Sequence, residues 1–214
     1  MAQSPGRAEF NVPYFHMKEF AHSVGVFEGW KGDEKRRRRF INCLVGLISK
    51  YALAGFACGI EKSIWNKIDN DYTLTESFGL PFALAGRDCV NKAHEWGEKL
   101  HNYKRNEILC VFESGDKGKG HLERVIGEAE KPGPHFVSKK PNEKTGESGN
   151  TPVQAADFAA WELLKATPKN DSPLQCHRIT LQKLSKAVPV SWTQYKESDF
   201  IALCSLGGVA RRKL

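Results

Sequence analysis

The stretch Thr151-Pro-Val-Gln-Ala-Ala-Asp-Phe-Ala-Ala-Trp-Glu-Leu-Leu164 combines a strong helix pattern with a charge on the inner face of that helix. Thr151 suits the N-cap position, and Pro152 suits the first helical position, where its missing N–H is no loss. Gln154 stands where a capping box has its reciprocal hydrogen-bonding partner. The sequence therefore predicts a helix with a well-marked start at Thr151.

An apolar arc follows from the rotation of about 100° per residue in an α-helix. It consists of Val153, Ala156, Ala160, Leu163 and Leu164. Asp157 falls inside this arc, so we expect its carboxylate to point toward the core. An unpaired carboxylate there would be costly, so its partner should be a backbone N–H group, an Arg or Lys side chain, or a metal ion. Glu162 lies about 140° around the helix from Asp157, and we expect it to be solvated.

The composition is that of a globular protein. The chain has 214 residues, a mass of 24.0 kDa and 40% hydrophobic residues, which suffices to bury a sizeable core. We expect a loose N-terminal segment over residues 1–13 and a single α/β domain over residues 14–214. Neither a long apolar run nor a secretory signal occurs, so we expect a cytoplasmic protein without a membrane partner.

Positive charge dominates the chain. A formal net charge of +7 and a pI of about 9.1 favour an anionic partner, with nucleic acid first. Residues 34–50 predict a helix with Asp33 as its N-cap, and its first turns carry Arg36, Arg37, Arg38 and Arg39. Consecutive arginines spread around a helix, so they cannot all contact one ligand. They form either a solvated cationic end or a patch that contacts nucleic-acid phosphates.

A strand, a glycine-rich turn and a helix are predicted over residues 106–131. The apolar run 106–112 is typical of a central strand covered on both faces, and a helix follows from about residue 121. Glu113 and Asp116 lie at the carboxyl end of the strand, where ligands gather in open α/β sheets. Alternatively, both are solvated turn carboxylates that cap the next helix. Lys117 and Lys119 of the same turn are candidate nucleic-acid contacts.

The remaining pattern also alternates strands and helices. Strands are predicted at 52–60 and 134–140, and helices at 75–101, with a break near Pro81, at 179–188 and at 197–206. Two glycines weaken the prediction for 52–60. The whole pattern predicts an α/β fold.

Glu113, Asp116 and Asp157 are three carboxylates that these arguments place on inner surfaces. Clustered carboxylates suit Mg²⁺ or Mn²⁺, and two such ions can activate water against a phosphodiester. His16 lies in the aromatic-rich stretch 14–20, where an ordered loop histidine is the simplest interpretation. Spacing alone does not bring these residues together.

Four motifs occur in sequence order: Phe15-His-Met-Lys-Glu-Phe20; Phe27-Glu-Gly-Trp30, followed by residues 35–40; Val111-Phe-Glu-Ser-Gly-Asp-Lys-Gly118; and Pro152-Val-Gln-Ala-Ala-Asp-Phe-Ala-Ala-Trp-Glu162. Together they resemble the bacterial family called domain of unknown function 3800. That family is similar to the ribonuclease H-like fold, a mixed sheet flanked by helices in which carboxylates hold metal ions. The resemblance implies Glu113, Asp116 and Asp157 as catalytic ligands of Mg²⁺ or Mn²⁺, with Gln154 and His16 as supporting residues.

Members of this family open with a strand that bears a Tyr-x-Asp-Glu-Ser type motif. No such motif precedes Phe15, so we expect the fold to be N-terminally incomplete. Two functions follow from the resemblance and the charge. The first is a metal-dependent nuclease-like domain that acts on nucleic-acid phosphodiesters. The second is a catalytically silent remnant of that fold that binds nucleic acid or another partner. A third reading has Asp157 pair with an Arg or cap a backbone turn in a scaffolding domain.

Overall fold

The computed structural model describes residues 10–115, 117–127, 133–138, 140–142, 149–166 and 178–212. The fold is mixed α/β. Of the described residues 62% are helical, and their strands form small parallel sheets, so helices build most of the packing. The chain divides into two compact units: unit 1 comprises Met1–Gly55 and Val137–Val190, and unit 2 comprises Phe56–Phe136 and Ser191–Leu214. Each unit is formed by two separate segments of the chain. The single domain that we predict over 14–214 stays a prediction.

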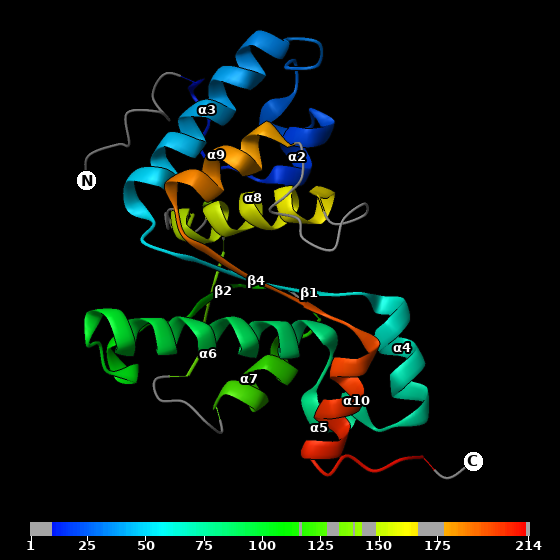
Figure 1. Cartoon of the computed structure of the whole chain (residues 1–214). Coiled ribbons are helices and arrows are strands. Elements are labelled where there is room, and N and C mark those ends of the chain that lie inside the picture. Colours follow the sequence, from blue (N-terminus) through cyan, green and yellow to red (C-terminus); the bar gives the residue numbers. More distant parts are fainter. Residues whose placement is uncertain are drawn as a thin grey trace. The chain divides into compact units, whose positions relative to one another are not determined.

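Helices form the regular structure of unit 1 (Figure 1). They are α2 (Met17–His22), the short 3-10 helix η1 (Gly25–Phe27), α3 (Glu34–Tyr51), α8 (Thr151–Ala166) and α9 (Ile179–Ala187). α9 contacts both α3 and α8, and α2 contacts α8. The helices predicted at 34–50, at 179–188 and from Thr151 are confirmed, as is the cap of α3, where Asp33 Oδ1 accepts a hydrogen bond from Arg36 N at 3.0 Å.

Aromatic rings dominate the core of unit 1. The buried members are Phe10, Val12, Phe15, Met17, Phe20, Phe27, Trp30, Phe40, Val45, Phe158 and Leu184. The rings of Phe15 and Phe158 meet edge to face with centroids 5.9 Å apart, which joins the segment before α2 to α8. Phe10 and Val12 belong to this core although we predict a loose segment over residues 1–13; residues 1–9 lie outside the described ranges.

Unit 2 contains both sheets and the remaining helices (Figure 1). In chain order its elements are β1 (Gly55–Ile60), α4 (Lys62–Asp71), α5 (Leu74–Phe78), α6 (Pro81–His101), η2 (Arg105–Glu107), β2 (Val111–Glu113), α7 (Lys119–Gly127), β3 (His135–Val137), β4 (Val190–Tyr195) and α10 (Glu197–Leu206). The end residues Gly55, Val137 and Val190 count with unit 1. β1 pairs with β4 and β2 pairs with β3, while α7 contacts α6 and α10 contacts α4.

A glycine explains how β4 lies against β1. A Cβ atom at Gly59 would lie 2.8 Å from a ring carbon of Trp192, so only a glycine leaves room for this indole. Glycines weaken the strand prediction from sequence, but Gly59 allows Trp192 of β4 to pack closely against β1. The strand predicted at 52–60 is confirmed as β1.

The central strand predicted at 106–112 is wrong in extent and in position. Its first residues form η2, where Glu107 Oε2 accepts a hydrogen bond from Lys104 N at 2.7 Å and closes a turn. Leu109 is 58% exposed, so one face of the run is uncovered. Among the described residues, β2 starts only at Val111 and pairs with β3 in a two-stranded sheet. The break predicted near Pro81 is confirmed, because α6 begins there.

Candidate functional site

Asp157 is half-buried on α8 and contacts the start of α2. Its Oδ2 accepts a hydrogen bond from the backbone N–H of Met17 at 2.8 Å. Met17 is the first residue of α2, and the first N–H groups of a helix have no acceptor within the helix. Of the three partners predicted for Asp157, the structure therefore contains the backbone N–H group. The Asp157 carboxylate on α8 therefore caps the N-terminus of α2.

Gln154 makes the neighbouring contact one turn earlier on α8. Its side chain is buried, and its Oε1 accepts a hydrogen bond from the backbone N–H of Phe15 at 2.9 Å. The predicted capping box with Thr151 is wrong: the cap is Asn150, whose Oδ1 accepts from Val153 N at 3.1 Å. Gln154 and Asp157 together fix the backbone of residues 15–17 on α8.

A charged cluster surrounds the start of α2. The Oε2 atom of Glu19 accepts a hydrogen bond from the Tyr14 hydroxyl at 2.8 Å, and its Oε1 accepts one from Lys140 Nζ at 2.5 Å. His16, the residue before α2, has its Nδ1 3.4 Å from Glu19 Oε1. The predicted supporting residue His16 thus lies beside a glutamate that the sequence does not single out.

The electrostatics of this cluster favour the charged forms of Glu19 and Lys140. Burial alone would raise the pKa of Glu19, but hydrogen bonds from Lys140, Tyr14 and His16 outweigh it and hold that pKa below its ordinary value of 4.5. The hydrogen bond to Glu19 raises the pKa of Lys140. Burial, followed by the Glu19 carboxylate, raises the pKa of Tyr14. The cluster is therefore an ion pair that ties Lys140 to α2.

The prediction that Glu162 is solvated is wrong. Its side chain is 4% exposed, and its carboxylate receives two hydrogen bonds from the guanidinium of Arg178, at 2.7 and 3.0 Å. The predicted apolar arc is confirmed for Val153 and Leu163, which are buried, and wrong for Ala156, Ala160 and Leu164, which are exposed. The buried residues of α8 are Val153, Gln154, Phe158, Glu162, Leu163 and Ala166. The aromatic ring of Phe158 buries more apolar area than alanines do, so it decides which face turns inward.

The three predicted metal ligands are divided among different parts of the chain. Glu113 ends β2 in unit 2, whereas Asp157 belongs to unit 1, and Asp116 lies outside the described residues. Within the described ranges, no three His, Cys, Asp or Glu side chains are grouped closely enough to hold a metal ion. Because Asp116 is not among the described residues, the predicted ligand set for Mg²⁺ or Mn²⁺ stays a prediction.

Arg37 differs from the other arginines of α3 because it has a structural role. Its side chain is only 16% exposed, and its Nη1 donates hydrogen bonds to Phe20 O at 2.9 Å and to Ser23 Oγ at 2.7 Å. The guanidinium also lies over the Phe20 ring, 4.3 Å from its centroid. Arg37 therefore attaches the first turn of α3 to the end of α2.

Arg36, Arg38 and Arg39 are exposed on the first turns of α3. The guanidinium of Arg36 lies 4.0 Å from the centroid of the buried Trp30 ring, and that of Arg39 lies 5.9 Å from the Phe10 ring. Stacking on a ring limits the freedom of a guanidinium while its N–H groups remain available at the edge. In the part of the chain that the structure describes, Arg36 and Arg38 have no acidic partner.

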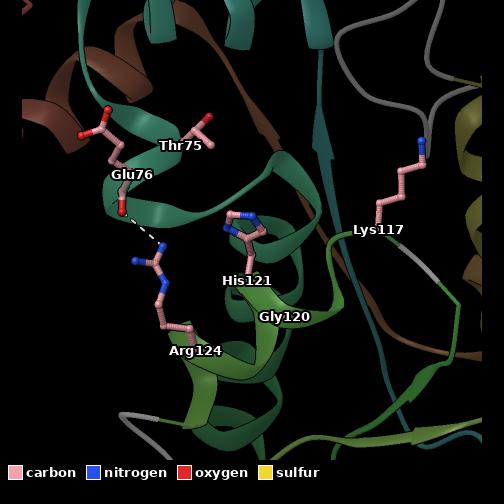
Figure 2. Close-up of a pocket in the computed structure, with 6 residues that line it drawn as sticks. All are labelled: Thr75, Glu76, Lys117, Gly120, His121 and Arg124. Atoms are coloured by element: carbon pink, nitrogen blue, oxygen red, sulfur yellow. Dashed lines mark hydrogen bonds between the residues drawn. The ribbon is translucent and has the colours of Figure 1, made fainter.

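A surface hollow in unit 2 contains one of the two predicted lysines. It is lined by Thr75, Glu76, Lys117, Gly120, His121 and Arg124 (Figure 2). Lys119 is not a lining residue: its Nζ lies 3.6 Å from Glu123 Oε1 and 4.8 Å from the centroid of the Phe136 ring. The structure thus separates the roles of two lysines that the sequence groups together.

A second polar cluster in unit 2 involves α6 and β4 and was not predicted. Lys92 Nζ lies 2.8 Å from Asp88 Oδ2 and also donates a hydrogen bond to the Thr193 hydroxyl. Burial raises the pKa of Cys89 to about 11, so this thiol is protonated and unreactive at neutral pH. The spacing of Asp88 and Lys92 on a predicted helix was the available signal for their ion pair.

Comparisons of the chain with protein-family models, with curated proteins and with solved structures found no match. The resemblance to domain of unknown function 3800 therefore rests on the four motifs and stays a prediction. Among the described helices, none is both long and apolar enough to cross a lipid bilayer.

Proposed function

We propose that the chain binds nucleic acid through the exposed arginines at the start of α3, and that Asp157 has a structural role. The observation that carries the proposal is the division among these arginines. Arg37 is used to hold α3 on α2, whereas Arg36 and Arg38 are exposed and have no acidic partner in the described ranges. An exposed guanidinium group without an acidic partner can bind phosphate oxygens, because it offers several N–H donors in one plane.

The positions of Asp157 and Gln154 favour binding over hydrolysis. Both side chains accept hydrogen bonds from the backbone of residues 15–17, which explains their place on α8 without a metal ion. The net charge of +7 supports association with a polyanion, since binding releases the counterions condensed on nucleic acid. The proposed function is the catalytically silent binding protein of the two functions predicted from sequence.

Binding of labelled duplex DNA, single-stranded DNA and single-stranded RNA, followed by fluorescence anisotropy, tests this proposal. We expect Arg36→Gln/Arg38→Gln to weaken binding about tenfold or more, because two charge-assisted contacts are lost. The matched control is Lys50→Gln/Lys186→Gln, which removes the same charge from exposed positions on α3 and α9. Equal weakening by both double variants would contradict a site on α3.

A metal-dependent nuclease of ribonuclease H-like fold is the second candidate. It is favoured by the four-motif resemblance and by Asp157, a half-buried carboxylate on a late helix. In this candidate, Glu113, Asp116 and Asp157 would hold Mg²⁺ or Mn²⁺, which would activate water for attack on a phosphodiester. Cleavage of labelled DNA and RNA with each metal separates the two candidates. Metal-dependent cleavage that is lost in both Asp157→Asn and Glu113→Gln would replace the binding proposal.

A further inference from the structure

The hollow in unit 2 is an open depression of the surface whose lining includes two cationic side chains. Its volume is about 590 Å³, which leaves room for a small anion. Figure 2 shows α5 on one side, with Thr75 and Glu76, and α7 on the other, with Gly120, His121 and Arg124. Lys117 comes from the turn before α7. Three of the six lining residues, Lys117, His121 and Arg124, therefore carry nitrogen groups in their side chains.

Arg124 is held in place without losing its charge. Its Nη2 donates a hydrogen bond to the backbone carbonyl of Glu76 at 3.1 Å, drawn as the dashed line in Figure 2. A neutral carbonyl orients the guanidinium but does not neutralise it. Neither Arg124 nor Lys117 has an acidic partner within the ranges that the structure describes. The hollow thus has two cations available to an anionic ligand.

Two carboxylates lie near the hollow, on Glu76 and Asp69, and each has a partner of its own. In Figure 2 the Glu76 carboxylate points away from the His121 ring, and its Oε1 lies 3.9 Å from Arg212 Nη2. Asp69 accepts hydrogen bonds from Thr75 N at 2.7 Å and from Thr75 Oγ1 at 2.8 Å. Among the lining residues, the two cations Lys117 and Arg124 therefore outnumber the one carboxylate, Glu76.

A close backbone contact fixes the position of His121. Gly79 follows α5 with φ +78°, and a Cβ atom there would lie 2.8 Å from Cβ of His121. Only a glycine allows both this conformation and this approach. The wall formed by α5 and α7 is therefore defined by packing.

We propose that this hollow binds a phosphomonoester group, with Arg124 and Lys117 as ionic contacts and His121 as a hydrogen-bonding side chain. A guanidinium pairs with two phosphate oxygens at once, and a lysine adds a compact charge. The phosphate belongs either to a free small molecule, such as a mononucleotide, or to the end of a nucleic-acid strand. This site goes beyond the proposed function, because it lies in unit 2 and uses none of the arginines of α3.

Calorimetric titration of the full chain with inorganic phosphate and with adenosine monophosphate tests this site. We expect Lys117→Gln and Arg124→Gln each to weaken binding about tenfold. Gly120→Glu should abolish it, because Gly120 lines the hollow, a Cβ atom there meets no atom within 4 Å, and the new side chain adds a negative charge to the lining. The controls are Lys62→Gln, at an exposed lysine of α4, and Gly127→Glu, at an equally open glycine at the far end of α7. Both should bind as the wild type does.

Oligonucleotides with and without a 5′-phosphate distinguish the two sources. Tighter binding of the phosphorylated strand, lost in Gly120→Glu, assigns the strand end; binding of adenosine monophosphate without this difference assigns a small molecule. Arg36→Gln/Arg38→Gln should leave the titration with phosphate unchanged, so failure of the α3 surface and failure of this site are separate results. The proposal is overturned if the wild type binds neither phosphate nor adenosine monophosphate, or if Gly120→Glu and Arg124→Gln bind like their controls.

Discussion

Asp157 shows what sequence can and cannot predict about a half-buried carboxylate. Its place on α8 was predicted from sequence, and so was its need for a partner. The identity of the partner, Met17 N, could not be predicted because it lies far away in the chain and a backbone N–H group has no sequence signature. The partner of Gln154 could not be predicted for the same reason, since its Oε1 accepts a hydrogen bond from the backbone N–H of Phe15 and not from its own helix.

A stability difference between two substitutions follows from this cap. Asp157→Ala removes the acceptor and should lower the free energy of unfolding by about 1 kcal/mol, the usual effect of a lost helix cap. Asp157→Asn keeps an oxygen at the same place and should cost less than about 0.5 kcal/mol. Urea unfolding with and without Mg²⁺ measures both. Stabilisation of the wild type by Mg²⁺ that is absent in Asp157→Asn would show that the carboxylate binds metal.

Glu19 gives a prediction for acidic pH. Its pKa is lowered in the folded state, so its contribution to stability is present above pH 4.5 and is lost as the pH falls through the lowered value. Glu19→Gln should therefore be less stable than the wild type at neutral pH, and this difference should shrink below pH 4.5. Urea unfolding over this pH range measures it. A difference that does not change with pH would mean that Glu19 contributes only by packing.

The elements show which sequence signals were sufficient. α3 and α8 were predicted because their capping residues and periodic apolar positions agree, although Asn150 rather than Thr151 caps α8. α4 and β4 were missed. Ile64, Trp65 and Ile68 had the spacing of a helix face, and β4 had alternating β-branched and aromatic residues, so both signals were present in the sequence. The 106–112 run failed because a capped turn at η2 competes with the strand.

The ion pair of Glu162 and Arg178 joins α8 to the residue that precedes α9. Arg178→Gln leaves a buried carboxylate without a counter-ion and should cost about 2–3 kcal/mol at neutral pH. Urea unfolding of the wild type and of this variant at neutral pH measures the difference.

The double variant Glu162→Gln/Arg178→Gln is the control for that prediction. Because it removes both charges, it should be more stable than Arg178→Gln alone. If the double variant loses as much unfolding free energy as Glu162→Gln and Arg178→Gln lose together as single variants, a direct coupling between the two side chains is contradicted.

The whole molecule consists of two compact units, and each has its own cationic feature. Unit 1 has the exposed arginines of α3, and unit 2 has the hollow that contains Lys117 and Arg124. From the net charge we predict an anionic partner. Composition does not show which cationic residues are exposed, and it does not distinguish Arg37 from the other arginines of α3. That distinction depends on Phe20 and Ser23, whose contacts with Arg37 arise only in the folded chain.

The dependence of nucleic-acid affinity on salt concentration tests the central claim most directly. Each phosphate contact contributes about 0.9 to the slope of log K against log salt for duplex DNA. The wild type should bind with a steep slope, and Arg36→Gln/Arg38→Gln should reduce its magnitude by about 1.8, whereas Lys50→Gln/Lys186→Gln and Asp157→Asn should leave it unchanged. An equal slope for wild type and Arg36→Gln/Arg38→Gln would contradict nucleic-acid binding by the start of α3.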